Sequence, residues 1–378
     1  MRAHAGILFA AAWLVLLAPG LAAAFAPTPN GPLYGGIPGA LPASFHYVYN
    51  DSYTGWPVRP LHAQHPIRGS FLDPRGKDDD GLSGYHFGID VNVDDHVPDS
   101  GASPTFSHAV YAVESGLARL PAGVLTRSCG ARRLDVGHFS YWHVSPIVRP
   151  WQRVRAGQQI GWTCRGMWHV HLSEWQRFLG VRIWVDPLHR GGKLVPYTDA
   201  APPVVSALSF FGPGLVPWLP LHTLVAPDSS PRLRAGSLHG LVEIRARIGD
   251  PQTFFGFLAR DPAWPTEFTP YRVDVTIAHA DGRAVLHRTE FRADQLPQTP
   301  YIDHYAPGTV EADNMQECVG PPALTRCAGT YWLRPLSRLR QEFWNTRAVA
   351  NGAYRVTVTA WDIAGNRTSL TQAVRVAN

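Results

Sequence analysis

Glycine and proline interrupt this chain so often that they limit what it can fold into. There are 35 Gly and 34 Pro among 378 residues. Both residues break helices and favour turns, so short strands joined by turns are expected in place of long helices. The chain is also longer than one hydrophobic core usually supports. We therefore expect an all-β protein with two domains.

The first 24 residues have the pattern of a secretory signal peptide. Arg2 precedes an apolar stretch at 5–17, and alanines at 22–24 provide a small-residue cleavage site. The apolar run is too short to span a bilayer comfortably, and no later stretch reads as a transmembrane segment. We expect an exported, soluble protein with no integral membrane span, secreted to an extracellular, periplasmic or cell-wall location.

The charge pattern gives no indication of a nucleic-acid partner. The formal net charge is +5, and nearly all of the basic residues are arginine. These arginines are scattered along the chain and form no basic run of the kind that binds a phosphate backbone. We expect no nucleic-acid binding, and the sequence indicates no particular oligomeric state.

Four cysteines form two groups that lie far apart in the sequence. An exported chain permits disulfides, and nearness in sequence favours the pairs Cys129–Cys164 and Cys318–Cys327. None of the four shows C-x-x-C spacing. A thiolate zinc site or a redox centre is therefore not expected.

The chain divides at Pro202-Pro203. Before it, residues 25–65 form a Pro/Gly-rich leader, in which alternating aromatic residues from Phe45 to Tyr53 predict an edge strand. Residues 66–198 contain short strands and turns.

After this boundary, residues 199–378 alternate strand-like segments with turn signals such as Asp281-Gly282 and Asn351-Gly352. This pattern predicts an antiparallel β-sandwich. An insertion at 294–347 carries two of the cysteines. The strands are expected at 241–248, 271–279, 284–291, 354–361 and 371–376.

Two strand-like segments each place metal-binding side chains on one face. His86 and Asp90 are four residues apart, and His169 and His171 are two apart, so each pair shares a strand face. Imidazole nitrogens and carboxylate oxygens are ordinary zinc ligands, and a catalytic zinc needs three protein ligands and an open position. His86, Asp90 and His171 could supply the three ligands. His169 would then lie near the metal without binding it, and His143 could join it from a neighbouring strand.

Other candidates are weaker. His138 lies five residues before His143, so in a regular strand it would face the opposite side. The acidic run at 73–81 lacks the ligand spacing of the helix–loop–helix calcium motif, and we interpret it as a solvated turn.

Five short motifs occur in an order that resembles the lysostaphin-type (LytM-like) zinc endopeptidases. The resemblance covers about a third of the chain. The motifs are H-x-x-x-D at 86–90, V-Y-A-V-x-x-G at 110–116, Y-W-H-V-S at 141–145, V-x-x-G-Q-x-I-G at 154–161 and H-x-H at 169–171.

This resemblance implies a zinc peptidase domain at 66–198 with a compact, partly open β-barrel-like core. It also implies one Zn²⁺ per chain and hydrolysis of peptide bonds in peptidoglycan cross-links or bridges. Matched residue by residue, His86, Asp90 and His171 take the ligand positions. His143 and His169 take the catalytic positions.

The chain departs from the family at three places. Residues 164–168 replace the usual glycine-rich loop, Ser173 stands where the family has Glu, and the loop after Asp90 is longer. These departures affect the substrate pocket more than the metal. A second resemblance, through residues 351–366, is to the last hairpin of bacterial immunoglobulin-like or fibronectin-like modules, which implies an immunoglobulin-like sandwich at 199–378.

Two other functions remain open at this stage. One is a non-catalytic cell-wall-binding protein, or an activator of other wall hydrolases, on the same scaffold, since the site and not the fold decides function. The other is a zinc protease that cleaves glycine-rich proteins.

Overall fold

The structure is a computed structural model that describes the chain in several ranges. The signal-peptide region and the predicted Cys318–Cys327 pair lie outside them. Among the described residues no helix is long and apolar enough to cross a membrane. The ranges are 40–74, 84–93, 107–121, 128–165, 167, 169–212, 230–252, 267–297, 299, 301–306, 309, 331–336 and 342–378.

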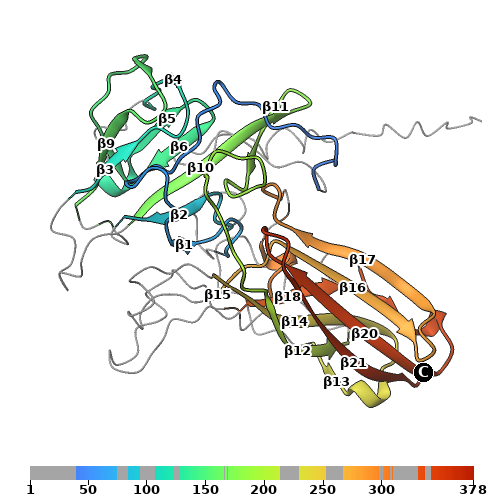
Figure 1. Cartoon of the computed structure of the whole chain (residues 1–378). Helices are drawn as coiled ribbons and strands as arrows, with labels where there is room; N and C mark the ends of the chain where they lie inside the picture. Colours follow the sequence, from blue (N-terminus) through green and yellow to red (C-terminus); the bar gives the residue numbers. More distant parts are fainter. Residues whose placement is uncertain are drawn as a thin grey trace, which may run out of the picture.

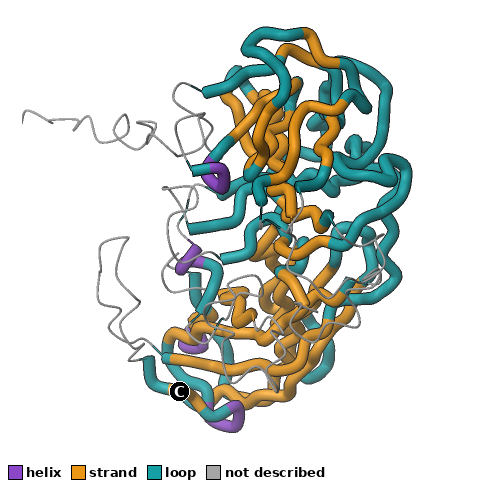
Figure 2. Tube along the Cα trace, turned by 90° about the vertical axis from the view of Figure 1, so that its left-hand side faces the viewer, coloured by secondary structure: helices purple, strands orange, loops and turns teal. Residues whose placement is uncertain are grey.

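All named strands in these ranges pair antiparallel, and the helical segments are short 3-10 turns. Figure 2 shows these turns as isolated pieces between strands. The prediction of an all-β chain is therefore confirmed for the described residues.

One group of strands follows the leader and surrounds β10 (Figure 1). The main sheet runs in the order β1-β2-β10-β6-β5, and β11 also pairs with β10. Across the described residues these pairings do not close into a ring. The bounds are β1 Ile67–Gly69, β2 Ile89–Asn92, β5 Arg133–Val136, β6 Phe139–Trp142, β10 His169–Phe178 and β11 Val181–Val185.

Smaller sheets complete this group. Three strands pair in the order β3-β9-β7, and β4 pairs with β8. The bounds are β3 Ala109–Tyr111, β4 Gly116–Leu117, β7 Val144–Pro146, β8 Arg153–Val154 and β9 Gln159–Thr163. β6 and β7 are separated by a single residue, His143, which lies in the left-handed region with φ of 64°.

A second group of strands contains two larger sheets. The first runs β13-β12-β14-β15, with β18 and β19 also on β14; the second runs β17-β16-β20-β21. The bounds are β12 Val204–Phe211, β13 Arg232–Leu233, β14 Leu241–Pro251, β15 Glu267–Phe268, β16 Arg272–His279, β17 Ala284–Arg292, β18 Tyr331–Leu336, β19 Trp344–Asn345, β20 Gly352–Trp361 and β21 Arg367–Val376.

The apolar residues of β16 and β20 in the second sheet alternate along each strand and are buried, as a period-two apolar pattern requires. Val273, Val275 and Ile277 of β16 are fully buried, as are Val356 and Val358 of β20. They belong to the same buried cluster as the apolar residues of β14. The turn at 362–366 joins β20 to β21.

The leader packs as part of the core. Trp56 is 1% exposed, and its indole Nε1 donates to the Pro196 carbonyl at 2.9 Å. The prediction of an edge strand from Phe45 to Tyr53 is wrong, because no strand forms there. The aromatic alternation has another cause: Tyr47 stacks on the His189 ring.

Candidate metal centre

Strand pairing places two of the expected ligands side by side. In the β2–β10 register, Asp90 lies directly opposite His171. Residues directly opposite in an antiparallel pair project from the same face, so their side chains meet. The β10–β6 register then brings Trp142 opposite His171 on the other side.

His86 arrives by a different route from the one expected. It precedes β2 and does not belong to a regular strand. Its backbone N–H donates to the Asp73 carbonyl at 2.7 Å, and its own carbonyl accepts from Leu72 N–H at 2.8 Å. This pairing with the turn after β1 delivers the imidazole to the same face as Asp90.

The three side chains converge on one point. His86 Nε2 lies 2.8 Å from His171 Nδ1 and 3.2 Å from Asp90 Oδ1. His171 Nδ1 lies 3.2 Å from the same Asp90 oxygen. All three residues are buried. They are one of two groups in the described residues whose His, Cys, Asp or Glu donors could hold a metal ion.

The nitrogens on the far side of both rings face oxygen atoms. His86 Nδ1 donates to the Ser70 carbonyl at 2.8 Å. Because a carbonyl only accepts, the neutral ring carries its lone pair on Nε2, toward the centre. His171 Nε2 lies 2.8 Å from Ser173 Oγ, which leaves Nδ1 toward the centre. Such outer hydrogen bonds orient metal-binding imidazoles.

The electrostatics favour a neutral His171 ring. Burial, followed by the neighbouring His86, lowers the pKa of His171 to about 3. A metal ion binds the unprotonated imidazole, so a ring that stays neutral at ordinary pH does not have to lose a proton before binding.

This donor set fits zinc. Two ligands at about 2.0–2.2 Å from a tetrahedral ion lie about 3.3–3.6 Å apart. The observed donor separations of 2.8 and 3.2 Å are close to this spacing. Two imidazoles and one carboxylate also match the ligand number of catalytic zinc sites, in which a fourth position stays open.

His169 lies beside this group and contacts a residue that the sequence did not suggest. The guanidinium Nη1 of Arg68 is 3.3 Å from His169 Nδ1, and His169 Nε2 is 3.5 Å from Asp90 Oδ1. Because a guanidinium only donates, Nδ1 accepts and the neutral ring carries its proton on Nε2. Burial holds the pKa of His169 well below its ordinary value, although Asp90 acts to raise it.

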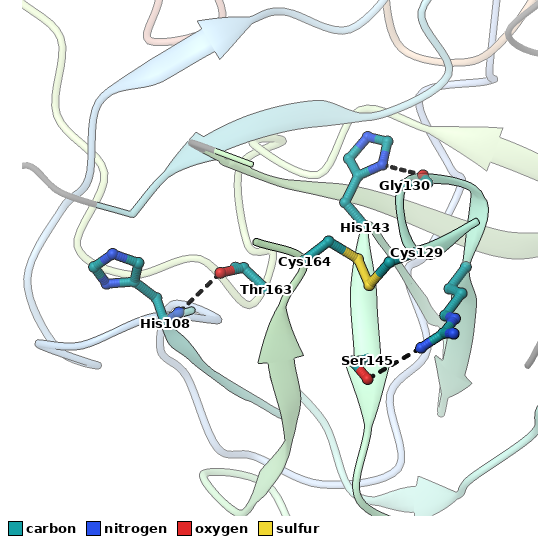
Figure 3. The surroundings of a disulfide bond; sticks show 8 residues. His108, Cys129, Gly130, His143, Ser145, Thr163 and Cys164 are labelled. Atoms are coloured by element: carbon teal, nitrogen blue, oxygen red, sulfur yellow. Dashed lines mark hydrogen bonds between the residues drawn. A yellow bond between two sulfur atoms is a disulfide. The ribbon is translucent and has the colours of Figure 1, made fainter. Parts of the chain in front are cut away.

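His143 faces His169 with the opposite tautomer. Their rings meet edge to face with centroids 4.9 Å apart. Nδ1 of His143 donates to the Gly130 carbonyl, so the lone pair of the neutral ring is on Nε2 (Figure 3). Both histidines are partly exposed, whereas the three central residues are buried.

A disulfide supports the Gly130 carbonyl. The predicted pair Cys129–Cys164 is confirmed. It joins the turn that contains Gly130 to Cys164, whose N–H donates to the His143 carbonyl at 2.8 Å. Figure 3 shows His143 directly beside this cross-link. The disulfide therefore links both backbone segments that contact His143.

Gly88 allows β10 to approach this closely. A Cβ at this position would lie 2.5 Å from the Leu172 carbonyl oxygen and 2.8 Å from both His171 Nε2 and Ser173 Oγ. Any side chain would therefore displace the pair that orients His171.

The competing histidines lie elsewhere. Nδ1 of His138 is 3.0 Å from a carboxylate oxygen of the buried Glu114, and its ring packs on Trp175. His65 bonds to the Pro60 carbonyl. Neither ring contacts the group formed by His86, Asp90 and His171 in the interactions that the structure describes.

Several contributing residues carry no sequence signal of their own. Ser70, Arg68 and Gly130 act through backbone or side-chain atoms that tertiary packing brings in from other segments. Ser173 was noted only as a departure from the family, yet it is the residue behind His171. Comparisons with family models, with curated proteins and with solved structures found no match.

Proposed function

We propose that this protein is a secreted zinc metalloendopeptidase that hydrolyses peptide bonds in peptidoglycan cross-links or bridges. The observation that carries the proposal is the convergence of His86, Asp90 and His171, with oxygen atoms at the far nitrogen of both imidazoles. The two ring nitrogens that face each other are 2.8 Å apart, and both lie 3.2 Å from the same Asp90 oxygen.

His143 and His169, which lie beside the three proposed ligands, are suited to different proton-transfer roles. A zinc ion held by the three ligands would lower the pKa of bound water to about 7. His143, with its lone pair on Nε2, is suited to accept a proton as general base. His169, with its proton on Nε2, is suited to donate to the oxygen that gains negative charge in the tetrahedral intermediate.

The identity of the substrate rests on the resemblance to lysostaphin-type peptidases. The five motifs carry that resemblance. The matched histidines and aspartate of three motifs, at 86–90, 141–145 and 169–171, lie together at one site. In this proposal residues 66–198 form a partly open barrel-like peptidase domain, and residues 199–378 form an immunoglobulin-like sandwich.

The test is a map of the products released from purified peptidoglycan, read by mass spectrometry. We expect wild-type protein loaded with zinc to release fragments cut at a peptide bond, and chelator to stop this release. The His143→Ala protein should bind the same wall material without cutting it.

Two results would overturn the proposal. Intact peptidoglycan peptides after incubation with the zinc-loaded protein would exclude wall hydrolysis. An unchanged biological effect of the His171→Ala protein would instead favour a binding or activating role without catalysis.

A further inference from the structure

A second group of acidic side chains lies away from the histidines, where three distant segments meet. Asp199 follows the first group of strands, Asp250 lies near the end of β14, and Asp362 begins the turn between β20 and β21. Their carboxylates offer ligand atoms within 4.8 Å of one another.

The β20–β21 turn holds the Asp362 carboxylate and the backbone of Asp199 in place. Asp362 Oδ1 accepts from the backbone N–H groups of Gly365 and Asn366, at 2.6 and 2.8 Å. The Asn366 side-chain amide donates to Asp362 Oδ2 at 2.7 Å and to the Asp199 carbonyl at 2.8 Å. The turn thus fixes Asp362 and binds the backbone of Asp199.

Asp250 differs from Asp362 because one of its carboxylate oxygens has no hydrogen-bond partner. Oδ1 is shielded from solvent and accepts no hydrogen bond from any described residue. A carboxylate oxygen that is shielded from solvent and has no donor or cation beside it is costly, so this oxygen points to a missing partner.

There is space for a partner at this junction. A cavity of about 40 Å³ is lined by Asp199, Asp250, Tyr197 and Gln252, among other residues. Roughly 10–15 Å³ of such volume suffices for one water molecule, so there is room for a small ion beside Asp199 and Asp250; Ile363, next to Asp362, also lines the cavity. The cavity also reaches Ile67 and Ser70 of the first strand group, so a ligand here would contact both groups.

We propose that Asp199, Asp250 and Asp362 form a calcium site that joins the two groups of strands. Three carboxylates form a hard, all-oxygen ligand set, which suits Ca²⁺ and not the imidazole-preferring transition metals. The ion neutralises the acidic charge and supplies the partner of Asp250. The proposal is independent of the zinc site, which uses none of these residues.

The test is calcium-dependent stability, measured on the His171→Ala protein so that the zinc site cannot contribute. Metal-free protein is titrated with CaCl₂ by calorimetry and melted with and without the ion. We expect one Ca²⁺ per chain and a rise in Tm of roughly 5 °C at saturating CaCl₂. ZnCl₂ at the same concentration should produce no such rise.

Asp250→Asn provides the matched variant. It keeps the shape of the side chain and removes the charge, so the metal-free protein should melt at or above the wild-type temperature while the calcium-dependent rise disappears. Asp199→Asn should also remove the rise, and serves if the first variant does not fold. Asp281→Asn, in an exposed turn of the second strand group, should keep it.

Absence of calcium binding to the metal-free protein up to millimolar concentrations would overturn the proposal. So would an equal Tm shift in the Asp250→Asn and Asp281→Asn proteins. Neither result would bear on the zinc site, whose metal content and wall hydrolysis are measured separately.

Discussion

Strand β10 borders two buried groups in which a carboxylate meets histidine. At its start, Asp90 of the neighbouring β2 contacts both His86 and His171. Farther along, Glu174 Oε1 lies 3.2 Å from His189 Nε2 and accepts from the Tyr49 hydroxyl at 2.8 Å.

The two groups have opposite electrostatics. Burial acts to lower the pKa of His189, but the Glu174 carboxylate outweighs it and raises that pKa. One carboxylate beside one histidine therefore gives a buried ion pair, with Tyr49 as an additional donor. For His171 burial and a second imidazole dominate, and its pKa falls to about 3.

The difference separates a buried ion pair from the proposed metal site. In the Glu174 group one carboxylate oxygen, Oε1, accepts hydrogen bonds from the side chains of Tyr49 and Gln176. In the Asp90 group two imidazole rings direct nitrogen atoms at one another and at the carboxylate. The following predictions test this contrast.

Removal of a ligand should have the largest effect. We expect the His171→Ala protein to lose bound zinc and to show peptidoglycan hydrolysis at the level of a protein-free control. The loss should exceed the roughly 10–100-fold that an outer hydrogen bond contributes. The His189→Ala protein, altered in the other group, should keep its zinc; retention of hydrolysis by His171→Ala would refute the ligand assignment.

Removal of the proposed base should leave the metal in place. We expect His143→Ala to bind zinc like the wild type while turnover falls by roughly 10²–10⁴-fold. Steady-state hydrolysis of a wall peptide, with zinc content measured on the same sample, tests this. His138→Ala is the control, because that ring contacts Glu114 and not the metal group. Equal losses in both variants would contradict the assignment.

Loss of the Ser173 hydroxyl, which lies beside His171 Nε2, should weaken zinc binding without abolishing it. We expect Ser173→Ala to reduce zinc affinity by about 10–100-fold, measured by competition with a chromophoric chelator. Ser140, paired with Ser173 across β6 and β10, is buried, and no described residue bonds to its hydroxyl. Ser140→Ala should leave the affinity unchanged, and an equal effect would point to packing alone.

Opening the disulfide should act through His143. A displacement of a reacting group by about 1 Å can lower the reaction rate on the order of 100-fold. Without the disulfide the Gly130 carbonyl that orients His143 is held less firmly, so turnover should fall by roughly 10-fold. We expect this in the Cys129→Ser/Cys164→Ser protein, with zinc content preserved. Unchanged turnover would show that the cross-link does not position His143.

The Glu174 group should affect stability and leave turnover unchanged. Glu174→Gln leaves the His189 charge without its partner, and we expect a loss of roughly 3 kcal/mol in the free energy of unfolding near pH 6. Because the folded-state pKa of His189 is raised, the stability it contributes is complete below its unfolded pKa and is lost as pH rises through the folded value.

The difference between wild type and Glu174→Gln should therefore shrink as pH increases from about 6 toward 9. Denaturant unfolding at a series of pH values measures it. A difference that grows with pH would contradict the ion-pair interpretation.

The sequence predicted that His86, Asp90 and His171 would lie together, because local spacing determines most of that geometry. His169 and His171 lie on the same strand, and Asp90 needs only the pairing of β2 with β10. His86 was placed by strand parity, although a turn and not a strand delivers it.

The supporting residues could not be predicted in this way. Arg68 and Gly130 reach the histidines through tertiary packing, which no local pattern encodes. For the segment from Phe45 to Tyr53 a local pattern predicted a strand that does not form. Its alternating aromatic residues make tertiary contacts from a loop. Tyr49 bonds to Glu174 without any strand around it.

The most direct test is the zinc content of two matched carboxylate variants, measured by mass spectrometry after metal loading and gel filtration. Asp90→Ala and Glu174→Ala each remove one buried carboxylate beside β10. We expect one zinc per chain in the wild type and in Glu174→Ala, and less than about 0.1 in Asp90→Ala, as removal of one of three ligands requires. No zinc in the wild type, or equal zinc in the wild type and Asp90→Ala, would contradict a metal centre at His86, Asp90 and His171.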